Sequence, residues 1–312
     1  MDNLILAFTV VFPLLAYLTL GYFLRRRGLW SEATVRQMNG ICFKLFLPVL
    51  LFENVRSIDL SQGVDFRLIG FSAAAIVLTF ILGWLLVPLL EKENPKRGVM
   101  IQCLFRSNFI LFGIPVALSL WGHDQLGDTA AVIAVIVPLF NFLAVLSLEL
   151  FREGKIQFGN IGKNILTNPL ILASLLGLLF LVAGIPLPGV IGSTTSAISK
   201  VATPLGLMVL GGSFSFAATR GLIRQLVICV VGRLIAVPAI WLTAGALLGF
   251  RGLAMITLLP LFGSPVATSS FAMAQQMGGD SDLAGQLVVY TSIFSIFTMF
   301  LWIVVLKSLC LF

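Results

Sequence analysis

The sequence predicts an all-α membrane protein of about ten transmembrane helices, arranged as two inverted five-helix repeats in which helices 4 and 9 are discontinuous and cross. Three features support this: the composition, the number of long apolar stretches and the recurrence of motifs. Of the 312 residues 59% are hydrophobic and 11% charged, and the mean hydropathy is +1.06. Soluble domains carry about 25% charged residues. Most of this chain is therefore expected to face lipid.

Ten stretches are long and apolar enough to cross a hydrocarbon core of roughly 30 Å, which requires about 20 helical residues. They are residues 3–24, 36–56, 66–90, 98–121, 129–151, 165–184, 190–216, 221–249, 252–275 and 283–311. The longest polar connection divides the ten stretches into five and five. We therefore expect a first repeat over 1–152, a cytoplasmic connecting loop over 153–164 and a second, inverted repeat over 165–312.

The basic residues predict the orientation. No basic residue precedes the first apolar stretch, and Arg25, Arg26 and Arg27 follow it directly, which is typical of an uncleaved first span with its N-terminus outside. In this orientation twelve of the 20 Lys and Arg residues fall in inner connections and four in outer ones. The net charge of +7 is therefore interpreted as topogenic, with no nucleic-acid partner. We expect a multi-pass inner-membrane protein with both termini periplasmic, and a homodimer is compatible with this arrangement.

Short motifs recur in the same order in the two halves. Pro13 and Gly21 match Pro169 and Gly177, and Lys44 and Pro48 match Lys200 and Pro204, both at an offset of 156; FGIPVA at 112–117 matches FGSPVA at 262–267, and Pro88 matches Pro238, both at an offset of 150. Order-preserving matches with two shared offsets are difficult to attribute to chance. Because each half has an odd number of predicted spans, the repeats would be inverted, as in many secondary transporters.

The repeated Phe-Gly-x-Pro-Val-Ala motif predicts a helix break in the middle of spans 4 and 9. Proline removes a backbone hydrogen bond, and the neighbouring glycine loosens the helix. Two breaks at matching positions of an inverted repeat favour discontinuous helices that cross near the bilayer midplane, where exposed N–H groups and positive dipole ends suit an anion. The alternative is that Pro115 and Pro265 only produce packing kinks.

The residues around these breaks are the candidate substrate-binding residues. They are Arg106, Asn108, Gly113, Ile114 and Pro115 in the first half and Gly263, Ser264, Pro265 and Thr268 in the second. Arg106, an arginine in the middle of a span, either contacts substrate or holds helices together, because a charge in lipid is costly without a cavity or a partner. Ser264 and Thr268 either contact substrate or bond to their own helix backbone.

Three further basic residues in spans have two interpretations each. Lys44 and Lys200 either extend toward the inner interface or add positive potential to an inner vestibule. Arg233, in the eighth predicted span, is similarly ambiguous.

The sequence lacks the residues that are characteristic of other functional classes. The four cysteines are widely spaced and His123 is the only histidine, so neither a disulfide framework, a metal site nor a cofactor is expected. No Walker-type loop, Gly-x-Ser-x-Gly elbow or His-Glu-x-x-His helix occurs, and we expect no enzyme. All 13 Asp and Glu residues lie in predicted loops or at span ends, with Glu53 and Glu149 nearest the core. This pattern argues against a dedicated carboxylate-driven coupling mechanism.

The whole chain resembles the bacterial branch of the auxin efflux carrier family of permeases. The matching segments are NGICFKLFLPVLLF at 39–52, NFILFGIP at 108–115, Gly122, PLGLMVLGGS at 204–213 and the segment from Pro265 to Asp282 that ends in QQMGGDSD. The resemblance implies a ten-span fold with a scaffold part and a transport part, similar to that of bile-acid sodium symporters and sodium/proton antiporters. It also implies that spans 4 and 9 cross at Pro115 and Pro265 and that Asn108 contacts substrate.

Related bacterial carriers are associated with malate or malonate, and plant relatives export auxin. These substrates are carboxylates, which agrees with the anion site expected from the helix breaks. The sequence therefore predicts a secondary transporter, a permease or efflux carrier that moves a small organic carboxylate by alternating access at the crossover of helices 4 and 9. The alternatives are a sodium- or proton-coupled symporter of the bile-acid symporter-like fold and, from another class, a membrane enzyme or receptor.

Overall fold

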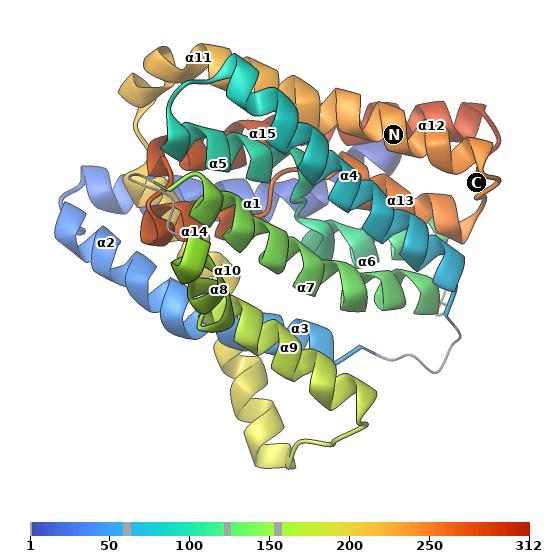
Figure 1. Cartoon of the computed structure of the whole chain (residues 1–312), viewed down its shortest axis with the longest axis horizontal. Helices are drawn as coiled ribbons and strands as arrows, with labels where there is room; N and C mark the ends of the chain where they lie inside the picture. Colours follow the sequence, from blue (N-terminus) through green and yellow to red (C-terminus); the bar gives the residue numbers. More distant parts are fainter. Residues whose placement is uncertain (1, 59–63, 122–125, 153–157) are drawn as a thin grey trace.

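The computed structural model describes residues 2–58, 64–121, 126–152 and 158–312, and these residues are almost entirely helical (Figure 1). Gly122, His123 and residues 153–157 of the expected connecting loop lie outside the described residues. In the described part of the chain, the β-type pairing consists of one isolated antiparallel bridge, between Ser107 and Val266. The predicted all-α class is therefore confirmed.

The helices follow the predicted apolar stretches closely. The first half contains α1 (Asp2–Arg26), α2 (Glu32–Ile41), η1 (Cys42–Phe46), α3 (Leu47–Arg56), α4 (Phe66–Leu90), α5 (Asn94–Phe105), α6 (Phe109–Trp121) and α7 (Gly127–Leu150). The second contains α8 (Phe158–Leu166), α9 (Pro169–Val182), α10 (Gly189–Ser213), α11 (Phe216–Val231), η2 (Gly232–Ala236), α12 (Val237–Leu247), α13 (Leu253–Gly263), α14 (Ser269–Met277) and α15 (Ser281–Ser308).

Five of the described helices are long and apolar enough to cross a membrane. They are Glu32–Arg56, Phe66–Leu90, Gly127–Leu150, Phe216–Leu247 and Ser281–Ser308. Shorter apolar helices occupy Phe109–Trp121, Pro169–Val182 and Leu253–Gly263. The chain is thus a multi-pass membrane protein, and the count of ten spans stays a prediction.

Two of the long helices contain one wide π-helical turn, and each of these turns ends just before a proline. The N–H of Leu47 bonds to the carbonyl of Cys42 in η1, and that of Val237 bonds to the carbonyl of Gly232 in η2. Pro48 and Pro238 follow directly. Because a proline ring clashes with the carbonyl four residues before it, an extra residue in the turn lets the helix continue past the proline.

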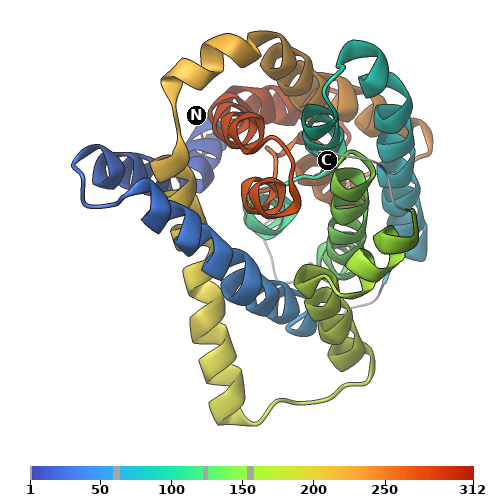
Figure 2. The ribbon, with the colours of Figure 1, turned by 60° about the vertical axis from the view of Figure 1, so that its left-hand side comes forward.

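The helices form two groups, which we name the panel and the bundle. The panel consists of α1, α2, η1, α3, α9 and α10, in which α1 packs along α10 and α3 along α9. The bundle consists of α4–α7, α11, η2 and α12–α15. In Figure 2, α2–α3 (blue) run from the left toward the bottom, and α10 (yellow) and α9 (olive green) lie below the ring of bundle helices. The two groups touch mainly through α1 with α15 and α7 with α9.

The panel depends on glycines at which two backbones meet. A Cβ atom on Gly21 would lie 1.8 Å from the carbonyl oxygen of Met208, and one on Gly177 would lie 2.8 Å from that of Phe52. The contacts are reciprocal, because Gly177 is 156 residues after Gly21 and Met208 is 156 residues after Phe52. Small residues of this kind let helices in lipid approach closely.

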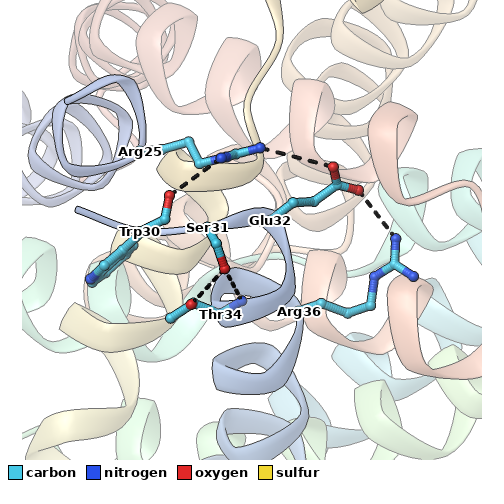
Figure 3. A network of polar contacts seen from close by, with 6 residues as sticks. All are labelled: Arg25, Trp30, Ser31, Glu32, Thr34 and Arg36. Carbon is cyan, nitrogen blue, oxygen red and sulfur yellow. Dashed lines mark hydrogen bonds and ion pairs between the residues drawn. The ribbon is translucent and has the colours of Figure 1, made fainter. Parts of the chain in front are cut away.

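One end of the molecule carries the turn between α1 and α2, whose polar contacts are drawn in Figure 3. Ser31 caps α2 by accepting from the N–H of Thr34 at 3.0 Å, and Arg25 donates to the carbonyl of Trp30 at 3.3 Å. Glu32 pairs with Arg25 and Arg36, both in exposed positions. Such pairs add little stability, so the cap and the backbone bond define this turn. The chain termini lie at the opposite end (Figure 1).

Substitution of Gly21 by alanine tests the close packing of the panel. The added methyl group would overlap the backbone of α10, so the free energy of unfolding should fall by about 1–3 kcal/mol or more. Thermal unfolding in detergent measures this change. The control is Gly70→Ala on the exposed face of α4, where a Cβ meets nothing within 4 Å and stability should stay equal or rise. Equal losses in both variants would contradict the close approach.

Candidate functional site

Two interrupted helices cross inside the bundle. The first interruption, residues 106–108, separates α5 from α6, and the second, residues 264–268, separates α13 from α14. The N–H of Asn108 donates to the carbonyl of Pro265 at 2.8 Å, and the N–H of Ala267 donates to that of Arg106 at 3.4 Å. The predicted crossing of two broken helices is therefore present. The N-termini of α6 and α14 and the C-termini of α5 and α13 all meet there.

The predicted break at Pro115 is wrong. Pro115 lies inside α6, and the interruption ends at Asn108, seven residues earlier. Pro265 does lie in an interruption, and the preceding Ser264 is extended (φ −74°, ψ 159°), as expected before proline. The two Phe-Gly-x-Pro motifs are therefore not equivalent. The first break occurs instead at an asparagine, a residue type favoured directly before a helix.

A cavity of about 110 Å³ lies beside the crossover, between the panel and the bundle. The panel contributes Leu47, Leu50, Leu51, Asn54 and Thr203, and the bundle contributes Arg106, Ser107, Asn108, Phe109, Ile110, Leu111, Val137, Phe140, Asn141, Ala267, Thr268 and Ser269. Pockets for drug-sized ligands measure roughly 300–1,000 Å³. This cavity therefore suits a small solute.

Three of the predicted site residues line this cavity: Arg106, Asn108 and Thr268. The others do not; they are Gly113, Ile114 and Pro115 in α6, Gly263 at the end of α13, and Ser264 and Pro265 in the interruption. Ser107 and Ser269, which flank the predicted residues, also line the cavity, whereas Asn54, Asn141 and Thr203 were not predicted from the sequence. Asn141 had a usable signal, since it is an amide in the middle of the long apolar stretch of α7.

Arg106 is the most unusual side chain of the cavity, because it is charged and only 2% exposed. Its guanidinium donates to Asn141 Oδ1 and to Ser269 Oγ, both at 2.8 Å, and contacts the sulfur of Met273. These partners are neutral, and the ion pairs found among the described residues do not include Arg106. A buried charge normally has a counter-charge. Arg106 thus joins three helices and keeps an unneutralised charge at the cavity.

Two neighbouring residues present polar atoms without a partner in the structure. Ser107 Oγ and Asn108 Nδ2 are buried and make no hydrogen bond to the described residues, although both residues line the cavity. An unsatisfied buried donor costs about 1–3 kcal/mol. Both donors, like the guanidinium of Arg106, therefore belong to residues that line the cavity.

The second buried arginine donates hydrogen bonds to the backbone at the crossover. Arg233 is fully buried and donates to the carbonyl oxygens of Ser264 and Leu104, both at 3.0 Å, and of Leu261 at 3.1 Å. It does not line the cavity. In contrast, Lys44 and Lys200 are exposed, and neither lines the cavity. Among the described residues, no cluster of three His, Cys, Asp or Glu side chains could hold a metal ion.

A multi-pass helical membrane protein with a polar cavity at crossing broken helices has the architecture of a transporter. Comparison with known proteins agrees with this class. A family model described as membrane transport protein matches residues 6–160 and 157–303. The chain therefore belongs to this family, that of the auxin efflux carriers, and is a transport protein and not an enzyme.

Similar proteins are known from archaea and bacteria. A protein named uncharacterized transporter from Methanocaldococcus jannaschii is 25% identical over 305 residues, which cover 94% of this chain and 96% of that protein. One of the same description from Methanothermobacter thermautotrophicus is also 25% identical, covering 95% of this chain and 97% of that protein. The uncharacterized transporter YfdV of Escherichia coli is 24% identical over 66% of this chain and 69% of its own.

Alanine substitution of the two motif prolines should have opposite effects. Pro265→Ala permits α13 to extend through the interruption and should lower the free energy of unfolding by about 1 kcal/mol or more. Pro115→Ala restores a donor inside α6, and its stability should be no lower than that of the wild type. Thermal unfolding of both variants in one detergent gives the comparison. A larger loss for Pro115→Ala would place the functional break there after all.

Proposed function

We propose that this protein is a secondary carrier that moves a small organic carboxylate, such as a malate-, malonate- or auxin-like anion, through the cavity at the crossover. One observation carries the proposal: the unneutralised guanidinium of Arg106 and the unpaired donors of Ser107 and Asn108 belong to residues that line the same cavity. A carboxylate supplies a negative charge and acceptor oxygens together. Bound there, it would pair with Arg106 and satisfy both donors.

The helix dipoles add to the positive potential of this site. Helices α6 and α14 both begin at the crossover, and a helix N-terminus is equivalent to about +0.5 charge. With the guanidinium of Arg106 the cavity therefore faces about two positive charges. Ser269, in the first turn of α14, accepts from Arg106, so the guanidinium lies against the positive end of that helix. An anion removes this repulsion, and a dianion would match the charge most closely.

The position of the cavity supports alternating access. The panel contributes one wall through α3 and α10, and the bundle contributes the other. Away from the cavity the two groups are joined by the hydrogen bond of Asn39 Nδ2, in α2, to Gln275 Oε1, in α14, at 2.6 Å, and Asn39 is fully buried. Displacement of the bundle against the panel would break this contact and separate the two walls of the cavity.

The reciprocal glycine contacts of the panel support the inverted repeat over 1–152 and 165–312. Under an offset of 156 the pair formed by Gly21 and Met208 becomes the pair formed by Gly177 and Phe52. A two-fold relation between the halves produces this exchange of partners. It is the construction of many secondary transporters, in which the halves have opposite orientation.

The positions of the basic segments support a topology with both termini outside the inner membrane. The predicted inner connections lie together: Gln225 of α11 donates to Glu91 at the end of α4, and the N–H of Asp280 donates to the carbonyl of Pro95. The N- and C-termini lie at the other end (Figure 1). The end rich in Lys and Arg would then be cytoplasmic.

Transport by proteoliposomes loaded with labelled malonate, malate or indole acetate tests the proposal. Wild-type protein should release at least one of these carboxylates, and Asn108→Ala and Arg106→Met should lower the rate by about tenfold or more, since each removes a partner of the buried anion. The control is Asn164→Ala on α8, a residue that does not line the cavity and whose loss should leave transport unchanged.

Two outcomes would contradict this function. In the first, no carboxylate moves while a neutral or cationic solute does. In the second, both variants fold and transport as fast as the wild type. A coupled symporter would differ in a further respect, because carboxylate uptake would then rise with an imposed sodium or pH gradient.

A further inference from the structure

Arg233 is the largest fully buried side chain of the described residues, and its guanidinium binds backbone alone. Its three acceptors belong to helix ends at the crossover. Leu104 lies in the last turn of α5, Leu261 in the last turn of α13, and Ser264 directly after α13. The last carbonyls of a helix have no partner within the helix. Arg233 therefore donates hydrogen bonds to the C-terminal ends of two helices at once.

The charge of Arg233 matches the dipoles of these two helix ends. A helix C-terminus is equivalent to about −0.5 charge, so two of them that meet give about one negative charge. In the interior of a bilayer water cannot solvate these carbonyls, and each unsatisfied group is costly. One guanidinium satisfies three carbonyls and balances the charge. For this arginine the helix ends replace the carboxylate that would otherwise be required.

Local features of η2 bring Arg233 to this position. A Cβ atom on the preceding Gly232 would lie 2.7 Å from Leu104 Cδ2, so the glycine lets η2 approach α5. The wide turn before Pro238 changes the direction of the side chains that follow. On the other side of the turn, the indole N–H of Trp302 donates to the carbonyl of Leu234 at 3.0 Å. The arginine is thus held from two neighbouring helices.

We propose that the guanidinium of Arg233 is a built-in cation of the crossover, occupying the place in which a transporter with coupled ions would hold a sodium ion or a proton. Carbonyl oxygens at the C-terminal ends of half-helices are the ligands that bind such ions in other carriers. Here a tethered cation fills that position. Arg233 is a positioning residue, and the carrier proposed above, on which this inference rests, needs no coupling cation.

The first experiment removes the tethered cation and supplies a free one. Arg233→Ala leaves the three carbonyls without a partner, so its melting temperature in detergent should fall, and millimolar guanidinium should raise it again because a ligand that binds only the folded state stabilises it. Choline at equal ionic strength should have no such effect. The matched control is Arg251→Ala, because Arg251 also donates to carbonyls at a helix end, those of Ala246 in the last turn of α12 and of Phe250 beyond it, but is exposed.

This experiment can overturn the inference without a transport assay. The inference fails if guanidinium stabilises Arg233→Ala no more than it stabilises the wild type and Arg251→Ala. It also fails if Arg233→Ala has the melting temperature of the wild type. Neither result depends on which solute is carried, so failure of the proposed carboxylate transport remains a separate outcome.

The second experiment separates charge from hydrogen bonding in variants with long side chains, in case Arg233→Ala does not fold. Arg233→Lys keeps the charge, and carboxylate efflux should persist without sodium. Arg233→Gln keeps donors without charge, and efflux should fall by about tenfold or more, as expected when a buried charge is removed from its partners, and should recover with millimolar guanidinium. Equal efflux by the Lys and Gln variants, or a sodium or proton requirement of the wild type, would refute the built-in cation.

Discussion

Non-helical backbone inside a membrane must find its hydrogen-bond partners within the protein, and the whole site depends on this constraint. Residues 106–108 and 264–268 meet it by pairing with each other. Asn108 donates to Pro265 and Ala267 donates to Arg106, so each interruption exists only because the other lies against it. Four helix ends are thereby fixed at one place, two with exposed N–H groups and two with exposed carbonyls.

Each of the two buried arginines lies at a different kind of helix end. Arg233 binds the carbonyls of Leu104, Leu261 and Ser264, so its charge is balanced by the C-terminal dipoles. Arg106 lies against the first turn of α14 through Ser269 and has only neutral partners, so its charge adds to the N-terminal dipoles. The same residue type therefore completes the backbone in one place and, in the proposed function, creates an anion site in the other.

The sequence was a good guide to the helices and a partial guide to the site. Apolar length sufficed for the helix bounds, since in lipid no other spanning structure satisfies the backbone of such a chain. The reciprocal positions of Gly21 and Gly177 were visible as an offset of 156. The break at Pro115 was mispredicted because a proline whose neighbours support it bends a helix without interrupting it. The position of the break is determined instead by the backbone pairing of Asn108 with Pro265. Asn54 and Thr203 were missed because they approach the cavity only when the panel packs against the bundle.

For the proposed carrier, the charge of the cavity connects binding to movement. An empty site with about two positive charges is costly to move against lipid and the panel, whereas a site that holds a carboxylate approaches neutrality. The loaded crossover therefore shifts past α3 and α10 more readily than the empty one does. Arg233 balances the charge of the carbonyl ends in both the empty and the loaded carrier. The difference in charge between these two states therefore arises from Arg106 and the substrate alone. An inside-negative potential then drives the anion outward by about 2.3 kcal/mol per charge per 100 mV.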